Sequence, residues 1–413
     1  MTEMPLRFSE AVAPGIHCQI RERAIFDFFK LDQQVGQIST CFSRALILRE
    51  SAWQQVSRLA EGLAQETIQA EQALLERPDL HGELGLSWGV RRALAQVRKR
   101  GRPCPGPRLI RFDFHWTQDG FQISEANTDV PGGQNETSCY PKLFAPHVPG
   151  CLPSPDVVEL QVRHLVQGLG TAPSIGLVHA SAYADDRQVM MYLATRLREQ
   201  GAIPHLLSPD GLRWSHEGEA SAITPAGGVK LSAILRFFPA EWLPNLPWRS
   251  GWRWHFSGSK TPMSNPATAL LTQSKRFPLV WDKLGVALPT WRSLLPESWD
   301  PGRLPRKKDD DTWLLKPAMG RVGHHVGIRE ACDGNEWASI QRAAKHNPAS
   351  WIAQKRFESI PIEADGVKWH VCLGIYTLEG RVAGAYGRVS DRPRIDQFAR
   401  DIAVFIEREV EPC

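Results

Sequence analysis

The alternation of hydrophobic and polar positions is clearest between residues 110 and 127. Apolar residues stand at every second position up to Phe114, and a second alternating run begins at Phe121. This period of two predicts two β-strands, each with one apolar and one polar face. A three-residue loop with Gly120 in the left-handed region would join them as a hairpin, with Thr117 facing Phe121.

On the polar face, the expected register pairs Asp113 with Glu125 and Arg111 with Asn127. Carboxylates that face each other on a sheet repel, and a cation between them removes the repulsion. Oxygen ligands of this kind suit Mg2+, which completes its coordination shell with water and substrate phosphates. The Arg111 guanidinium beside them is suited to a phosphate or a substrate carboxylate. A solvated polar face on an edge hairpin is the plainer alternative.

The N-terminal part of the chain shows mainly helical spacing. Between residues 17 and 100, apolar residues recur at helical intervals from Trp53 to Leu75, and a second helical run lies near residues 90–97. The basic cluster at residues 98–100 is typical of a solvated helix end. We therefore expect a helical segment over residues 1–105 that packs on the rest of the chain.

A different pattern, of short apolar runs between amphipathic stretches, occupies residues 151–265. The runs predict strands at 175–179, 203–207 and 234–238, with a helix at 185–198 between the first two. This strand–helix–strand order indicates a parallel α/β unit. The first turn lacks a GxGxxG pattern, so a Rossmann dinucleotide site is not supported.

The last third of the chain contains a second candidate for phosphate chemistry. A predicted strand at 313–317 carries Lys316 and leads into a loop with Gly320, Arg321 and Gly323. Such glycines let the backbone approach phosphates closely, although the lysine precedes them and the loop is not a Walker A motif. A plain hairpin with a solvated lysine is the alternative.

The other elements expected beyond residue 266 give this part an α+β character. The pattern predicts mostly helical structure at 267–281, strands at 351–355, 369–377 and 381–386, and a closing helix at 397–409. Histidines 324 and 325 fall in the glycine-containing loop, where exposed histidines without a catalytic role are the usual case.

Composition narrows the possible classes of protein. The chain has 413 residues, enough for two or three domains. Its formal net charge of +4 gives no argument for a nucleic-acid partner. It has no apolar run long enough to span a membrane, and its start lacks a signal peptide, so we expect a cytoplasmic protein. Eight cysteines without a CxxC pair predict free thiols and no zinc site.

Several of these motifs together resemble the synthetase domain of the glutathionylspermidine synthetases, a circularly permuted ATP-grasp family. Arg111-Phe112-Asp113 with Glu125-Ala126-Asn127 resembles the family's RxD…ExN element, and residues 127–131 resemble its NADTP stretch. The run from Lys316 to Gly323 is similar to its KPxxGRxG loop. Ser274-Lys275, followed by residues 277–281, is similar to its NK…LPLLW segment.

The resemblance implies a fold, a cofactor and site residues. The fold is α/β and α+β multidomain: an ATP-grasp fold with a preceding parallel α/β (pre-ATP-grasp) domain and a helical N-terminal segment. The implied division is helical segment 1–105, metal-binding hairpin and loop 106–150, substrate-side α/β domain 151–265, and nucleotide-binding lobes 266–413. Asp113, Glu125 and Asn127 would bind Mg2+, and Arg111 would lie at the reacting phosphate. The implied ATP-contacting residues are Lys275, Lys316, Gly320, Arg321, Gly323, Gln354 and Arg388.

The resemblance also implies an ATP-dependent ligase that joins a small-molecule or peptide carboxylate to an amine through an acyl phosphate. Departures at Gly132-Gly133-Gln134 and Ser274, and the lack of a Cys/His amidase module, leave the acid and the amine open. A non-catalytic ATP-grasp-like module that binds a nucleotide or peptide is one alternative. A phosphotransferase that stops at the phosphorylated acid is another. The oligomeric state is open, with a homodimer as one option.

Overall fold

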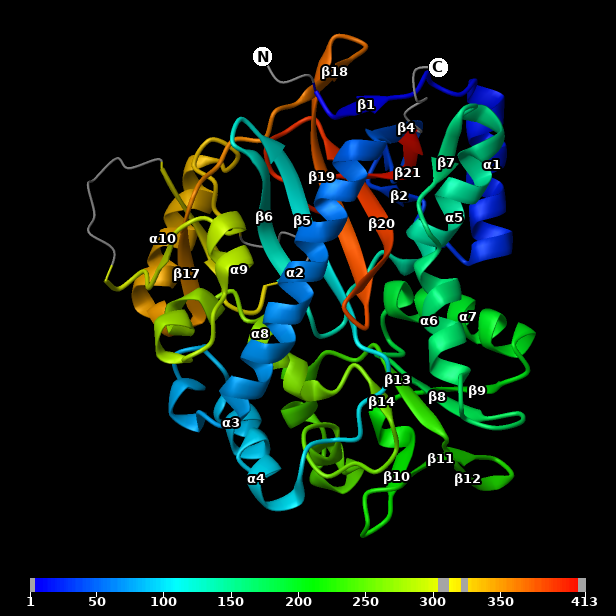
Figure 1. The fold of residues 1–413 in the computed structure, drawn as a ribbon, viewed down its shortest axis with the longest axis vertical. Helices are drawn as coiled ribbons and strands as arrows, with labels where there is room; N and C mark the ends of the chain where they lie inside the picture. Colours follow the sequence, from blue (N-terminus) through cyan, green and yellow to red (C-terminus); the bar gives the residue numbers. More distant parts are fainter. Residues whose placement is uncertain (1–3, 304–311, 321–325, 408–413) are drawn as a thin grey trace.

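The computed structural model of the protein describes residues 4–303, 312–320 and 326–407 (Figure 1). Within these residues the largest sheet has nine strands, in the order β1-β4-β21-β20-β19-β5-β6, with β7 on β21 and β18 on β19. Its strands are β1 (Leu6–Phe8), β4 (Cys41–Arg49), β5 (Leu109–Thr117), β6 (Gly120–Asn127), β7 (Cys151–Pro153), β18 (Ile362–Ala364), β19 (Val367–Leu378), β20 (Arg381–Ser390) and β21 (Arg400–Glu407).

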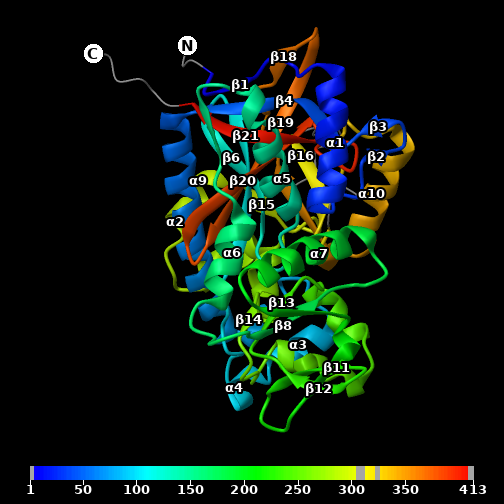
Figure 2. The same cartoon turned by 90° about the vertical axis from the view of Figure 1, so that its right-hand side faces the viewer.

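Helices cover both faces of this sheet. The long helix α2 (Glu50–Leu75) lies across one face, and α1 (Pro14–Phe28) and α5 (Gln134–Phe144) lie on the other (Figures 1 and 2). Each face of the sheet packs into its own hydrophobic core, and successive residues of a strand alternate between them. Leu46 packs on the α2 side, whereas Ile47 packs on the α5 side.

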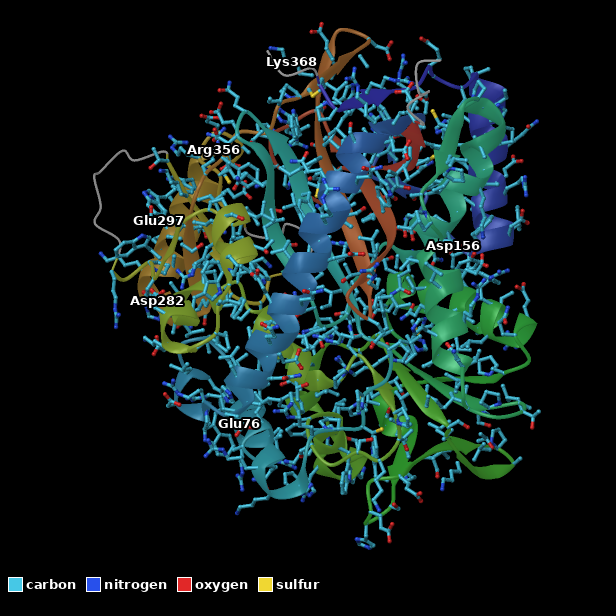
Figure 3. All side chains as sticks on the ribbon, in the orientation of Figure 1. Glu76, Asp156, Asp282, Glu297, Arg356 and Lys368 are labelled. Carbon is cyan, nitrogen blue, oxygen red and sulfur yellow. The ribbon has the colours of Figure 1, made fainter. Side chains whose placement is uncertain are left out.

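Helix α6 (Val157–Val166) is capped by Asp156, which is labelled in Figure 3. The Asp156 carboxylate also pairs with Lys142 of α5 at 2.5 Å.

The hairpin predicted within residues 110–127 is present as strands β5 and β6. The pairs Asp113–Glu125 and Arg111–Asn127 are confirmed, but Thr117 pairs with Gly120 and not with Phe121. A bulge at Ser124 accounts for the difference, because it adds one residue to β6 between the turn and the polar pairs.

A four-stranded parallel sheet lies below the large sheet in Figure 1. Helix α7 (Ala184–Glu199) connects its first two strands, which confirms the predicted strand–helix–strand unit. The strands are β8 (Ser174–Val178), β9 (Ile203–Leu207), β13 (Ala233–Arg236) and β14 (Met263–Ser264). A small antiparallel sheet beside it contains β10 (Leu212–Trp214), β11 (Ala220–Thr224) and β12 (Gly227–Lys230).

A third unit at the left of Figure 1 contains the sheet β15-β17-β16, with α10 (Gly334–His346) packed on it. The strands are β15 (Ser298–Trp299), β16 (Trp313–Pro317) and β17 (Trp351–Lys355), so the predicted strands at 313–317 and 351–355 are confirmed. The remaining elements are β2 (Gln34–Val35), β3 (Ile38–Ser39), α3 (Trp88–Leu94), α4 (Val97–Arg100), α8 (Leu270–Gln273) and α9 (Pro289–Leu294).

One secondary-structure prediction was wrong and two were only partly right. The expected closing helix at 397–409 is the strand β21, and the largely helical stretch 17–100 contains the strand β4. Both strands are buried on both faces in the middle of the sheet, so their apolar runs lack the alternation that marks a strand. Residues 267–281 form only the short α8 and 3-10 turns, with Lys275 in the link between them.

The division into four segments stays a prediction, although strands β1 and β4 show that the first segment contributes to the large sheet as well as to its helical cover. Across the described part of the chain, no helix is both long and apolar enough to cross a membrane.

Candidate active site

A cavity of about 880 Å3 lies against the polar side of the β5–β6 hairpin. Its walls come from distant parts of the chain, because Lys30, Tyr183 and Lys316 line it together with the hairpin residues. The predicted site residues that line it are Arg111, Asp113, Glu125, Asn127, Lys316 and Arg388. Arg356, labelled in Figure 3, lines it from the β15–β17 unit. A small adjoining cavity is lined by Lys275 and Gln354 and shares Glu125 and Lys316 with the large one.

Arg111 and Asp113 form a bidentate ion pair on β5. The Arg111 Nε and Nη2 atoms donate to the two carboxylate oxygens at 2.7 and 2.9 Å, and Asn127 Nδ2 donates to Asp113 Oδ2 at 3.1 Å. Arg111 Nη1 also donates to the Gly132 carbonyl at 2.5 Å, which Tyr376 contacts through its hydroxyl. Burial opposes the charge on Arg111, but Asp113 together with Tyr376 and Tyr386 raises the arginine pKa well above its ordinary value.

Glu125 faces Asp113 across the hairpin and bonds to a different cation. Its Oε2 lies 2.9 Å from Lys275 Nζ. Burial opposes ionisation of Glu125, yet Lys275 and Lys316 lower its pKa to about 2. Each carboxylate of the opposed pair therefore has a basic partner within the protein. The repulsion expected from the sequence is offset by Arg111 and Lys275, so it does not by itself require a metal ion.

Lys316 lies on β16, and its side chain is buried. It donates to the Ser124 carbonyl at 3.1 Å and to Gln354 Oε1 at 2.8 Å, which fixes its direction toward β6. Burial lowers the pKa of Lys316 to about 8, an effect that neighbouring Lys275 reinforces and Glu125 opposes. Lys275 also donates to the carbonyl of Gly320 at 2.7 Å and so connects the two predicted lysine motifs.

Arg388 reaches the same cavity from β20. Its Nη2 donates to the Asp396 carbonyl at 2.6 Å, while its buried Nε has no hydrogen-bond partner among the described residues. Arg321 and Gly323, two predicted ATP-contacting residues, lie outside the described residues, as do the loop histidines 324 and 325. We call the group Arg111, Asp113, Glu125, Lys275, Lys316 and Arg388 the basic end of the site.

Sequence reasoning missed a second cluster on the same cavity, which we call the acidic end: Lys30, Asp32, Glu136 and Asp401. The Lys30 ammonium lies 2.8, 2.5 and 3.1 Å from Asp32, Glu136 and Asp401, respectively. Lys30 is only 2% exposed. Burial opposes its charge, but Asp401 and Glu136 raise its pKa well above the ordinary value.

Glu136 differs from its neighbours in this cluster. Burial raises its pKa, and its Oε2 has no hydrogen-bond partner in the described part of the chain. The four residues of the acidic end lie in three distant stretches of the chain, so the local sequence pattern gives no signal that they are neighbours in the fold. Only the packing of α5 and β21 against the N-terminal segment brings them together.

The donor set on the hairpin suits a hard cation. Asp113, Glu125 and Asn127 present carboxylate and amide oxygens on one face of two paired strands, which is the chemistry that Mg2+ selects. Within residues 4–303, 312–320 and 326–407, no group of three or more His, Cys, Asp or Glu side chains is arranged to hold a metal ion. A magnesium ion at the hairpin would therefore take two carboxylates and complete its shell with other oxygens.

A family model described as glutathionylspermidine synthase preATP-grasp matches residues 43–407. The chain belongs to this family. The resemblance inferred from the RxD…ExN and lysine motifs is thereby confirmed, and the matched span includes the described residues of the basic end. Lys30 and Asp32 of the acidic end precede it.

Two individual proteins illustrate the relationship. A Haemophilus influenzae protein named "Putative acid–amine ligase" is 24% identical over 257 residues, which cover 60% of this chain and 62% of that protein. The match thus spans less than two thirds of the relative. The structure of a glutathione synthetase-like effector from Globodera pallida, in its apo form, aligns with a TM-score of 0.65 at 11% identity, over 96% of this chain and 98% of the effector. This likeness shows a shared fold of mixed α/β type.

Proposed function

We propose that this protein is an ATP-dependent carboxylate–amine ligase with an ATP-grasp arrangement, which forms an amide bond through an acyl phosphate. The observation that carries the proposal is one cavity lined by two clusters of opposite net charge. Cations and oxygen donors gather at the basic end, and an excess of carboxylates gathers at the acidic end. Membership of the family and the name of the Haemophilus relative support the same class of reaction.

The basic end suits the polyphosphate of ATP. Lys275, Lys316 and Arg388 supply positive charge, and each pairing with a phosphate oxygen at 4 Å is worth roughly 4 kcal/mol at an effective dielectric of 20. Asp113, Glu125 and Asn127 would hold Mg2+, which would offset the negative charge of the phosphates. By the family resemblance, Gly320, Arg321, Gly323 and Gln354 complete the nucleotide contacts.

The proposed reaction has two steps. An oxygen of the acid substrate attacks the γ-phosphorus and ADP leaves, which gives an acyl phosphate. The bound ammonium loses a proton, the resulting amine nitrogen attacks the acyl carbon, phosphate leaves, and the nitrogen loses a second proton. Arg111, held rigidly by Asp113 and the Gly132 carbonyl, is placed to stabilise the charge that develops on the transferring phosphoryl group.

The acidic end suits the amine. Three carboxylates surround the single ammonium of Lys30, so an excess of negative charge remains beside the cavity. The Glu136 carboxylate, which lines the cavity with its Oε2 buried and unpaired among the described residues, would attract the ammonium form of an incoming amine. A phosphotransferase that stops at the phosphorylated acid would have no use for such an end, whereas a ligase needs a second site for its nucleophile.

The proposal is tested first by isothermal titration calorimetry with ATP, with and without Mg2+. We expect binding that depends on Mg2+ and that Glu125→Ala weakens by about tenfold or more, because the metal loses a carboxylate. The matched control is Glu358→Ala, which removes an exposed carboxylate that also lines the cavity. ADP release with mixtures of acids and amines then identifies the substrates.

Two results would contradict the proposal. An absence of ATP binding under every condition would favour a non-catalytic module. ADP release that never depends on an amine would favour the phosphotransferase.

A further inference from the structure

We propose that Arg236 and Gln273 are positioning residues for the reaction. They hold residues 127–133, here called the clamped segment, which joins the metal-binding hairpin to helix α5. The inference rests on the proposed function, because it assigns a role in the same site. It concerns two residues that the family motifs described above do not include.

The first part of the clamp is a buried ion pair. Arg236, at the end of β13, donates through Nη2 to Asp129 Oδ1, and the two side chains are 0% and 1% exposed. The other carboxylate oxygen of Asp129 accepts the Ala240 N–H at 2.9 Å. Arg236 also donates to the carbonyls of Asn265 and Phe238, at 3.0 and 2.5 Å. Each nitrogen of the Arg236 guanidinium and each oxygen of the Asp129 carboxylate thus has a hydrogen-bond partner.

The second part of the clamp replaces strand pairing. Strand β6 ends at Asn127, yet Gln273 Oε1 accepts the N–H groups of Thr128 and Asp129, at 2.7 and 2.9 Å. The Asn265 amide donates to the carbonyls of the same two residues, at 3.1 and 2.9 Å. All four backbone groups of two consecutive residues are therefore held by side chains from elsewhere in the chain.

The clamped segment carries two contacts of the basic end. Asn127, at its start, donates to Asp113, and the carbonyl of Gly132, near its end, accepts from Arg111. A shift of the segment would therefore disturb a proposed metal ligand and the proposed phosphoryl-stabilising arginine together. Gln273 lines both cavities, whereas Arg236 and Asp129 line neither, so Asp129→Asn is the variant that tests action through the segment alone.

The position of Arg236 also connects the site to the parallel α/β unit. The next residue, Phe237, lines the cavity, whereas Arg236 itself turns away from it into the clamp. One strand end therefore contributes a wall on the substrate side and a support for the hairpin side. Ligands of open parallel sheets lie at the carboxyl ends of the strands, where this residue pair stands.

If Arg236 and Gln273 only stabilised the fold, substitutions in the clamp would lower the stability of the protein and leave Mg2+ dependence and kcat unchanged. The test therefore uses Gln273→Met, which removes the acceptor at a half-buried position, and Asp129→Asn, which removes the charge. The matched control is Thr261→Val, which removes a buried acceptor that bonds the Ala220 N–H at 2.8 Å, far from the clamped segment in sequence. Gln273→Glu keeps an acceptor oxygen and serves as the conservative variant.

Three quantities are measured for each variant: amide hydrogen exchange of residues 127–133 by mass spectrometry, the Mg2+ concentration that half-saturates ATP binding, and kcat. In Gln273→Met we expect faster exchange in the segment, a raised half-saturating Mg2+ concentration, and a kcat lowered about 10- to 100-fold, because small misplacements of reacting groups carry such penalties. The melting temperature should fall no further than in Thr261→Val. Gln273→Glu should retain slow exchange.

Unchanged exchange and unchanged Mg2+ dependence in Gln273→Met and in folded Asp129→Asn would overturn the inference. Equal effects in Thr261→Val would overturn it as well, because the change would then reflect general loss of stability. The exchange readout does not depend on turnover. A wild-type protein that releases no ADP with any acid and amine would instead contradict the proposed function.

Discussion

The two ends of the cavity hold their buried charges in opposite ways. At the basic end, Arg111 and Lys275 each hold one carboxylate of the hairpin, and Lys316 and Arg388 bring the set to four basic side chains against two carboxylates. At the acidic end, a single ammonium serves three carboxylates. This contrast indicates that the net charge of each end, more than its individual ion pairs, would select one reactant of the proposed ligase. Under the proposed function, a polyphosphate would complement the first end and an amine would complement the second.

The cations of the two ends should also differ in what they do for the fold. Lys30 offsets carboxylates that are already buried, so Lys30→Met should lower the free energy of unfolding by about 3–5 kcal/mol. Lys316 is held at a pKa of about 8 by burial, which means that its charge costs folding energy, and Lys316→Met should leave stability equal or higher. Urea unfolding of both variants measures the contrast. Equal losses in the two would remove the distinction.

The acidic end should select the amine without affecting the nucleotide. Glu136→Gln keeps the shape of the side chain and an acceptor for Lys30 but removes a negative charge beside the cavity. We expect the KM for the amine to rise about tenfold, equivalent to roughly 1.4 kcal/mol, while the KM for ATP stays unchanged. Steady-state kinetics with each substrate varied separately measures this. Glu358→Gln is the control, and a shift in the KM for ATP alone would reverse the assignment of the two ends.

The basic end should take up a proton when it binds phosphate near pH 8. Lys316, with a pKa of about 8 against an ordinary 10.5, is about half neutral at that pH in the free protein, and a polyphosphate favours its charged form. Lys316 should therefore take up about half a proton on binding at pH 8 and almost none at pH 6, where it is already charged. Calorimetry in two buffers of different ionisation enthalpy measures the uptake. Uptake that persists in Lys316→Met would assign it to another group.

Three groups that face Lys316 have shifted pKa values, and the shifts move them away from pH 8, so they do not account for the expected proton uptake. Lys275 and Lys316 lower the pKa of Glu125 to about 2 against the effect of burial, and burial with the charge of Lys316 lowers that of His115 to about 4. Burial raises the pKa of Cys372 well above its ordinary value. The other charged neighbours are Asp113 and Lys275. The double substitution Lys316→Met with Lys275→Met separates the two lysines.

Sequence reasoning found the part of the site that is encoded by a local alternation of apolar and polar residues. The β5–β6 hairpin has one solvent-excluded apolar face, so its alternation revealed the strands and the polar register from Arg111 to Asn127. The only register error was at the turn, where the bulge at Ser124 has no signature in the hydrophobic pattern. Strand β16 with Lys316 was visible for a similar reason, because it is a short apolar run that ends at proline.

The part that was missed depends on tertiary structure. Strands β4 and β21 are apolar on both faces, and such runs do not distinguish a strand from a buried helix. The acidic end and the clamp unite residues far apart in the chain, such as Lys30 with Asp401 and Asp129 with Arg236. Their residue types are common, and only the folded arrangement shows that they are neighbours.

The central place of β21 in the large sheet has a consequence for biosynthesis. Strand β4 pairs in parallel with β21, and β21 alone connects it to β20 and the strands beyond. At 5–20 residues per second, on the order of 20–70 s separate the appearance of these two strands on the ribosome. During that interval the apolar edge of β4 is unpaired, and the edge of β20 is also unpaired once β20 has been made. Unpaired apolar strand edges expose the nascent chain to aggregation. Slow translation or early release before residue 407 should therefore yield insoluble chains in place of a partly working enzyme.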